Sequence, residues 1–277
     1  MSQSHSSPKF YTEALPLRGT PLDMLPGIRR IVANNPGPMT YHGTNTYLLD
    51  TGTGCIVVDP GPDDPVHIAA IHAATAGRID AILLTHSHID HVAGLPSLRG
   101  TIPVHAYFAP QEPDIAPDVP MRDGDTLAGW TAIHTPGHAG DHLCFARADG
   151  VVLSGDHIMG WSTTVVSPPH GDMAAYFASL DRMLTTGGHT YLPGHGPAIT
   201  DPAAFTTALR GHRLAREAAI LSALAAPMPI DALTQAVYVG LAPNLLQAAQ
   251  RNVLSHLQKL LAEGRVEQVA GLWRPIR

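Results

Sequence analysis

Four potential metal ligands lie close together between residues 86 and 91. The segment THSHIDH (85–91) contains His86, His88, Asp90 and His91. Histidines at i and i+2 can turn toward one ion only where the backbone is extended or looped, and Asp90 and His91 follow at once and point elsewhere. The spacing therefore favours two neighbouring ions over one. The chain also holds 17 histidines, as many as Lys and Arg together, which is typical of metal chemistry.

Four further segments each place one histidine or aspartate beside Gly or Pro. They are Asp59 in VDPG, His138 in TPGH, Asp156 in SGD and His195 in PGHG. Together with the HxHxDH run, and in this order, they resemble the signature of the metallo-β-lactamase superfamily. The resemblance implies an α/β fold, an αββα sandwich with a dinuclear zinc site between its two sheets. It also implies that Asp59 is a carboxylate that supports the histidine loop.

Carried over position by position, the resemblance implies seven metal ligands. One zinc ion is held by His86, His88 and His138, the other by Asp90, His91 and His195, and Asp156 bridges them. Asp90 is in addition the predicted catalytic residue. Imidazole and carboxylate suit a borderline divalent ion, and two such ions can acidify a bridging water, whose hydroxide would be the nucleophile.

Two positions at which branches of the superfamily differ indicate which metal and which reaction to expect here. Flavodiiron-type relatives have a glutamate where this chain has His88, so the resemblance favours zinc and hydrolysis over redox iron. The secreted antibiotic-degrading branch usually has a cysteine where this chain has Asp156. Neither Cys55 nor Cys144 stands at a ligand position, which disfavours a dedicated β-lactamase.

Short apolar runs position these residues. We expect strands at 46–49, 55–58, 81–84 and 151–153, the last three followed at once by polar residues such as Asp59, His86 and Asp156. Sites commonly form at such strand ends. Helical spacing predicts helices over 65–75 and 173–184, the second with an N-cap signal at Asp172.

The pattern changes after Pro202, where Gly and Pro thin out. Three helical stripes follow, the third over Val253, Leu254, Leu257, Leu260 and Leu261, and then a strand, turn and strand over 265–276. This order is typical of a winged helix. We therefore predict a loosely ordered segment at 1–27, a metallo-β-lactamase domain at 28–203 and a winged-helix-like domain at 204–277.

The substrate must be inferred from the C-terminal tail, residues 204–277. It resembles that of the β-lactamase-like protein 2 family, which implies a zinc-dependent endoribonuclease acting on single-stranded RNA. The alternative is a thioesterase or lactonase of small metabolites, similar to hydroxyacylglutathione hydrolases. A winged-helix nucleic-acid binder without activity is a third option, which the intact ligand set disfavours.

The net charge of the C-terminal segment favours RNA binding, whereas that of the preceding residues disfavours it. Residues 204–277 have a net charge of +4, whereas residues 1–203 have one of −10. If the tail binds RNA, the solvent-facing residues of its third helix are the predicted phosphate contacts: Arg251, Ser255, Gln258 and Lys259. Trp161 and Tyr41 are candidates for the pocket lining.

The composition of the chain disfavours a disordered protein and a membrane-spanning one. Hydrophobic residues make up 44% of the chain and charged residues 14%, as in a folded globular protein. No apolar stretch has the length of a spanning helix, and we expect neither a leader peptide nor a membrane partner.

The two cysteines lie in apolar runs and are expected as buried thiols, so we predict a cytoplasmic location. The oligomeric state is open, with a homodimer as one option.

Overall fold

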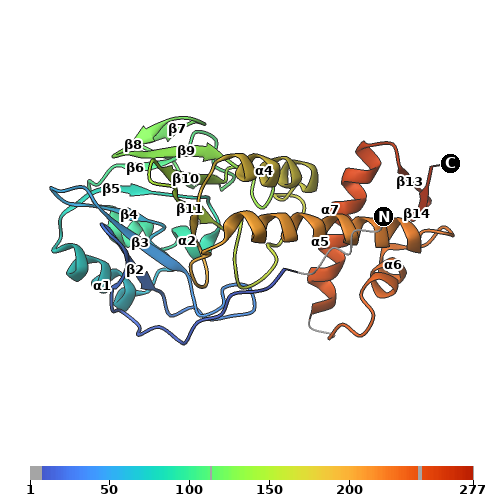
Figure 1. Cartoon of the computed structure of the whole chain (residues 1–277), viewed down its shortest axis with the longest axis horizontal. Coiled ribbons are helices and arrows are strands. Elements are labelled where there is room, and N and C mark those ends of the chain that lie inside the picture. Colours follow the sequence, from blue (N-terminus) through green and yellow to red (C-terminus); the bar gives the residue numbers. More distant parts are fainter. Residues whose placement is uncertain (1–7, 113, 243–244, 277) are drawn as a thin grey trace.

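The computed structural model describes residues 8–112, 114–242 and 245–276. Two β-sheets pack face to face with helices on their outer sides, and a mainly helical unit follows at the C-terminal end (Figure 1). The predicted αββα sandwich is thereby confirmed.

The first sheet has seven strands in chain order. Its first four strands are antiparallel and its last four are parallel, β4 belonging to both sets. The strands are β1 (Leu22–Leu25), β2 (Ile28–Val32), β3 (Asn45–Asp50), β4 (Cys55–Val58), β5 (Ile79–Leu83), β6 (Val104–Tyr107) and β7 (Val119–Met121).

The second sheet has five strands in the order β12-β11-β10-β9-β8. Neighbours are antiparallel except for β11 and β12, which are parallel. The strands are β8 (Thr126–Leu127), β9 (Trp130–His134), β10 (Leu143–Arg147), β11 (Val151–Gly155) and β12 (Thr190–Pro193).

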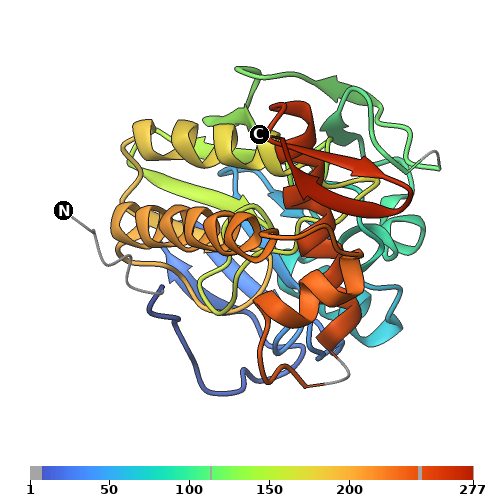
Figure 2. The same ribbon diagram turned by 90° about the vertical axis from the view of Figure 1, so that its right-hand side faces the viewer.

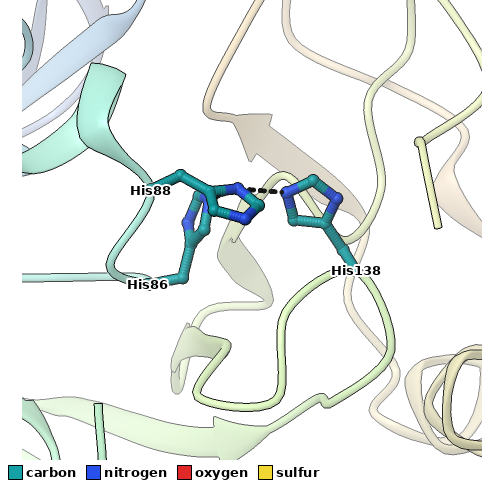
Figure 3. A group of neighbouring side chains, drawn as sticks. All are labelled: His86, His88 and His138. Atoms are coloured by element: carbon teal, nitrogen blue, oxygen red, sulfur yellow. Dashed lines mark hydrogen bonds between the residues drawn. The ribbon is translucent and has the colours of Figure 1, made fainter. Parts of the chain in front are cut away.

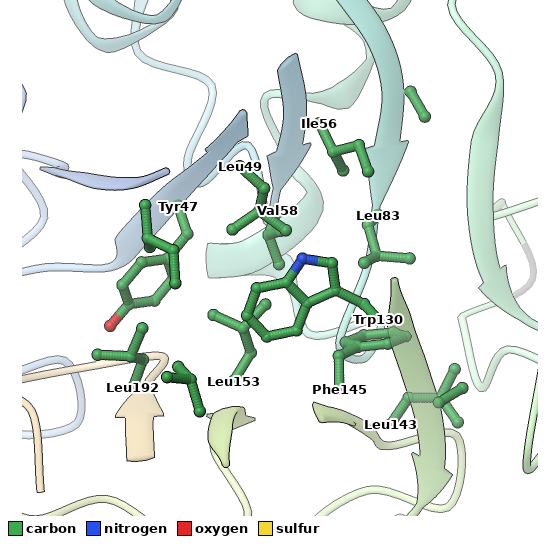
Figure 4. Close-up of a cluster of buried hydrophobic side chains, with 14 of the residues drawn as sticks. Tyr47, Leu49, Ile56, Val58, Leu83, Trp130, Leu143, Phe145, Leu153 and Leu192 are labelled. Carbon is green, nitrogen blue, oxygen red and sulfur yellow. The ribbon is translucent and has the colours of Figure 1, made fainter. Parts of the chain in front are cut away.

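Apolar side chains from both sheets fill the space between them (Figure 4). Tyr47, Val58 and Leu83 of the first sheet meet Trp130 and Phe145 of the second, and all five are buried. Alternate strand residues face outward instead, into a second layer of core. Burial on both faces explains why the runs at β4 and β11 are continuously apolar.

Helices cover the outer faces. On the first sheet lie α1 (Pro65–Thr75) and α3 (Leu95–Arg99), and the short α2 (Ile89–Val92) precedes α3. On the second sheet, α4 (Met173–Thr185) and α5 (Pro202–Ala223) lie side by side (Figure 2). The predicted helix over 65–75 has its predicted bounds because the Asp64 side chain accepts a hydrogen bond from the Val66 amide and Pro65 occupies the first turn.

The C-terminal unit is built from α5, α6 (Ile230–Val237), α7 (Leu246–Ala262) and the hairpin of β13 (Val266–Val269) and β14 (Leu272–Pro275). Its core contains Ile220, Leu224, Leu233, Val253, Leu257, Leu260, Val266 and Trp273. The winged-helix prediction is confirmed. Leu261 differs from its expected place in the core stripe, because its side chain is 44% exposed at the end of α7.

One continuous helix serves both units. Phe205 and Leu209 in the first half of α5 pack against the second sheet, whereas Ile220 in its second half belongs to the winged-helix core. The boundary predicted between residues 203 and 204 therefore falls inside α5.

Of the segment expected to be loosely ordered at 1–27, the structure describes residues 8–27, and these make defined contacts. Leu22–Leu25 pairs with β2, Tyr11 packs against Phe205, and Glu13 forms an ion pair with the buried Arg30 at 2.8 Å. Both cysteines are free and buried, as expected. Among the described residues, no helix is long and apolar enough to cross a membrane.

Candidate metal centre

The predicted site residues lie in loops and one short helix that follow strands β5, β9, β11 and β12. His86 and His88 come after β5, Asp90 and His91 lie in α2, and His138 comes after β9. Asp156 directly follows β11 and His195 follows β12. The two sheets thus contribute loops to the same edge of the sandwich, and this brings all seven residues together.

Three histidines form the first part of the cluster (Figure 3). His88 Nδ1 lies 3.0 Å from His86 Nε2 and 2.9 Å from His138 Nε2. Each ring offers one nitrogen, and the three atoms lie within 4.8 Å of one another. Such a set can hold a metal ion from three sides.

Asp90, His91 and His195 form a second such group, and Asp156 lies between the two groups. His195 Nε2 is 3.1 Å from an Asp90 oxygen and 3.4 Å from an Asp156 oxygen. His91 Nε2, His195 Nε2 and Asp156 Oδ1 are buried and lie 3.1–3.6 Å from one another or from Asp90, yet among the described residues none of these contacts has the geometry of a hydrogen bond. Because unpartnered buried polar atoms are costly, their convergence fits metal ions in this position.

The electrostatics differ between the two parts. Burial, and then the rings of His91 and His88, lower the pKa of His86 well below its usual value, and burial with His138 lowers that of His88 to about 3. Burial also opposes protonation of His195, but the Asp156 carboxylate raises its pKa to about 9. His86 and His88 therefore offer neutral rings, whereas His195 carries a proton that a metal ion would displace.

Asp59 holds the histidine loop, as the resemblance implied. Its two carboxylate oxygens accept hydrogen bonds from the Thr85 amide at 2.8 Å and the Thr85 hydroxyl at 2.7 Å. One of them also lies 2.9 Å from His91 Nδ1. This contact turns the other His91 ring nitrogen toward the cluster.

Backbone carbonyls orient two further rings of the cluster, those of His138 and His195. His138 Nδ1 lies 2.7 Å from the Val165 carbonyl oxygen, and His195 Nδ1 lies 3.3 Å from that of Gly43. The Asp156 amide donates to His142 Nε2 at 3.1 Å, so His142 supports the cluster from behind rather than joining it. The sequence motifs carry no signal for the Val165 carbonyl, because a backbone carbonyl can belong to any residue type.

Gly194 lets the loop after β12 approach the cluster. A Cβ atom at this position would lie 2.4 Å from Asp156 Oδ1 and 2.8 Å from His91 Cε1. Only a glycine leaves room for both side chains.

A cavity of about 400 Å³ opens onto the cluster. His88, Asp90, His138, Asp156 and His195 line its floor, and Met39, Trp161, Val165, Pro168 and Pro169 contribute apolar wall. Trp161 is thus placed as predicted, while Tyr41 stacks on Trp161 with ring centroids 5.1 Å apart. Arg251 of α7 also lines the cavity, so the C-terminal unit completes the site.

The other third-helix residues predicted to contact phosphate are placed differently. Ser255 is buried, and Lys259 is largely covered by Glu217 and Glu263, with which it forms ion pairs at 2.9 and 2.7 Å. Of the four predicted residues only Arg251 lines the cavity, while Gln258 is exposed elsewhere. The helical stripe showed the core face correctly but not how much of the remaining surface α4 and α5 cover.

Comparisons with known proteins agree with this geometry. Residues 39–118 and 106–195 match the model described as metallo-beta-lactamase superfamily, and residues 230–273 match that of the beta-lactamase associated winged helix domain. The chain is 34% identical to a beta-lactamase-like protein 2 homolog of Drosophila melanogaster, covering 86% of this chain and 88% of the relative.

Two further similarities extend over most of the chain. An atrochrysone carboxyl ACP thioesterase of Aspergillus chevalieri is 37% identical, over 78% of this chain and 73% of the relative. The crystal structure of a beta-lactamase domain protein from Burkholderia ambifaria superposes with a TM-score of 0.82 at 22% identity, covering 95% of this chain and 96% of that one. The latter supports the fold alone.

Proposed function

Because the chain belongs to the metallo-β-lactamase superfamily, whose members are generally hydrolases that bind metals, we propose that it is a hydrolase dependent on two zinc ions. The observation that carries this proposal is the convergence of three buried atoms, on His91, His195 and Asp156, that make no well-formed hydrogen bond among the described residues and lie beside the three-histidine group. Neutral imidazole and carboxylate are ligands that zinc accepts.

In this proposal His86, His88 and His138 would hold one ion and Asp90, His91 and His195 the other, and Asp156 would be a shared ligand because it lies between the two groups. The ions would supply a water of lowered pKa and polarise the bond to be cleaved. Asp59, Thr85 and the Gly43 and Val165 carbonyls fix the ring orientations. Asp90 lines the cavity with its carboxylate 26% exposed, and we assign it the proton-carrying role.

The substrate class that the cavity supports best is an acyl thioester. Its walls are mainly apolar, with Met39, Trp161, Val165, Pro168 and Pro169, and they suit an acyl group better than a polyanion. The similarity to a protein named as an acyl carrier protein thioesterase supports the same class. The thioesterase alternative from the sequence thus becomes the first candidate.

Single-stranded RNA is the second candidate. Arg251 and Trp161 both line the cavity, and a cavity that contains a cation and an aromatic ring can bind phosphate and stack a base. RNA ranks lower because other tail cations are already neutralised, for example Lys259 by Glu217 and Glu263 and Arg265 by Glu217.

The test compares substrates on the zinc-loaded protein. We expect hydrolysis of butyryl-N-acetylcysteamine, its loss on chelation and its return on adding zinc. Asp156→Ala should lower the rate at least about 100-fold, whereas Asp149→Ala, which alters an exposed carboxylate, should not. Cleavage of a single-stranded RNA oligonucleotide without thioester turnover would favour the second candidate. If the zinc-loaded protein hydrolysed neither the thioester nor the RNA, both candidate functions would be refuted.

A further inference from the structure

Among the described Lys and Arg residues of the C-terminal unit, Arg251 differs from the others in that its guanidinium makes no ion pair or hydrogen bond within the described part of the chain. Arg210 pairs with Asp181, Lys259 and Arg265 pair with Glu217, and Arg274 pairs with Glu267. Arg213 donates to the Thr164 carbonyl, and Arg216 donates to the Val237 carbonyl. Within the described residues, no ion pair or hydrogen bond of the Arg251 guanidinium is present. Its charge is therefore available to a ligand.

Arg251 lines the same cavity as the candidate metal ligands. Among the described residues that line it, Arg251 is the one Lys or Arg, and the metal ligands lie on its floor. Apolar side chains, including Trp161 and Pro168, lie along the walls. A molecule with its scissile group at the metal cluster can therefore reach one fixed positive charge in the same cavity.

The helix that carries Arg251 is held firmly. Val253 and Leu257 of α7 are buried in the winged-helix core. The next residue, Asn252, accepts a hydrogen bond from the buried Arg213 at 3.2 Å, and Arg213 also donates to the Thr164 carbonyl beside the cavity wall. Arg251 thus projects from a backbone that is tied to the same loop as the metal site, which favours a pre-organised contact.

We propose that Arg251 binds an anionic group of the substrate, a carboxylate or a phosphate, and so selects acidic substrates for the cluster. The inference rests on the proposed function for the position of the scissile bond. A guanidinium binds carboxylate and phosphate with two parallel hydrogen bonds, which adds geometric selection to charge attraction. The winged-helix unit would then be a specificity element of the active site, contributed by α7.

Two pairs of thioesters separate the sources of the anion. The acyl pair is butyryl- and glutaryl-N-acetylcysteamine, which differ in a carboxylate on the acyl half. The thiol pair is butyryl-N-acetylcysteamine and butyryl-coenzyme A, in which the charge lies on phosphates of the thiol half. We expect the wild type to prefer the acidic member of one pair. Arg251→Gln should reduce that preference about tenfold or more, mainly through a higher KM for the acidic substrate. Arg251→Lys should retain part of the preference for the acidic substrate, because lysine keeps the positive charge.

Arg274→Gln is the matched control, because it removes the same charge from the hairpin, where Arg274 pairs with Glu267. Binding is measured in parallel by calorimetry with the non-hydrolysable thioether analogues of the same compounds. If thioesters are not turned over but the acidic analogue still binds more tightly and this depends on Arg251, only the proposed reaction fails. Equal binding of acidic and neutral analogues by the wild type, or a preference unchanged in Arg251→Gln, would overturn the role of Arg251.

Discussion

At the scale of single residues, the site depends on side chains that prepare the cluster without belonging to it. Asp59 fixes both the Thr85 amide and the His91 ring, and Gly194 leaves room beside Asp156. The seven predicted ligands could be found in the sequence because each lies in a short local motif. Partners such as the Val165 carbonyl could not, since only the fold brings them to His138.

Gly194→Ala tests how tightly this cluster is packed. The new methyl group would collide with Asp156 Oδ1 and His91, so we expect the metal content to fall to less than half and the hydrolysis rate to fall about 100-fold. Gly140→Ala is the control, because its Cβ would meet only the terminal amide of Gln111. Metal analysis and thermal unfolding are measured together. Full metal content in a folded Gly194→Ala protein would contradict the described packing.

At the scale of secondary structure elements, Glu217 joins the parts of the winged-helix unit. From α5 it pairs with Lys259 of α7 at 2.9 Å and with Arg265, just before β13, at 3.1 Å, while His256 lies 3.6 Å away. The sequence predicted these elements from their apolar stripes. It did not predict that Lys259 faces α5, because periodicity identifies the core face of a helix but not the polar neighbours at its border.

The charge of Glu217 makes the stability of this unit depend on pH. Burial would raise the Glu217 pKa, but His256 and Lys259 hold it at about 2, below its value in the unfolded chain. A lowered folded-state pKa stabilises the fold above the unfolded value of about 4.3, and this contribution is lost as the pH falls toward 2. Glu217→Gln should therefore lower the free energy of unfolding by about 1–3 kcal/mol at pH 7.

The difference between wild type and Glu217→Gln should shrink steadily from pH 5 to pH 2 in denaturant titrations. Glu267→Gln, which removes a carboxylate that is 41% exposed in the hairpin, should change the free energy of unfolding by less than about 0.5 kcal/mol. A Glu217→Gln deficit that is the same at every pH would show that packing, and not charge, is responsible.

At the scale of the whole molecule, α5 connects the sandwich and the winged helix. Its Arg213 is buried between the two units, with Thr164 on one side and Asn252 on the other. The Thr164 hydroxyl in turn donates to the Asp156 carbonyl at 2.9 Å, and its neighbour Val165 accepts from His138. A domain boundary read from composition could not show this connection, because it runs through a helix that both cores share.

Arg213→Met should weaken both stability and the metal site. Loss of the guanidinium leaves buried polar groups without a partner, so we expect about 1–3 kcal/mol lower stability and weaker zinc binding. Arg210→Met lies three residues away on α5 and removes an exposed ion pair with Asp181, so it should change stability by less than about 0.5 kcal/mol. Zinc affinity equal to that of the wild type in folded Arg213→Met protein would show that the connection does not reach the cluster.

We propose that seven residues of this chain hold two zinc ions. Metal analysis of protein purified without chelator tests it most directly, with the metal identified and counted per chain. We expect close to two zinc ions per chain in the wild type and fewer in Asp156→Ala, which loses the ligand between the two groups. A single ion per chain after saturation with zinc, or iron in place of zinc, would contradict the account.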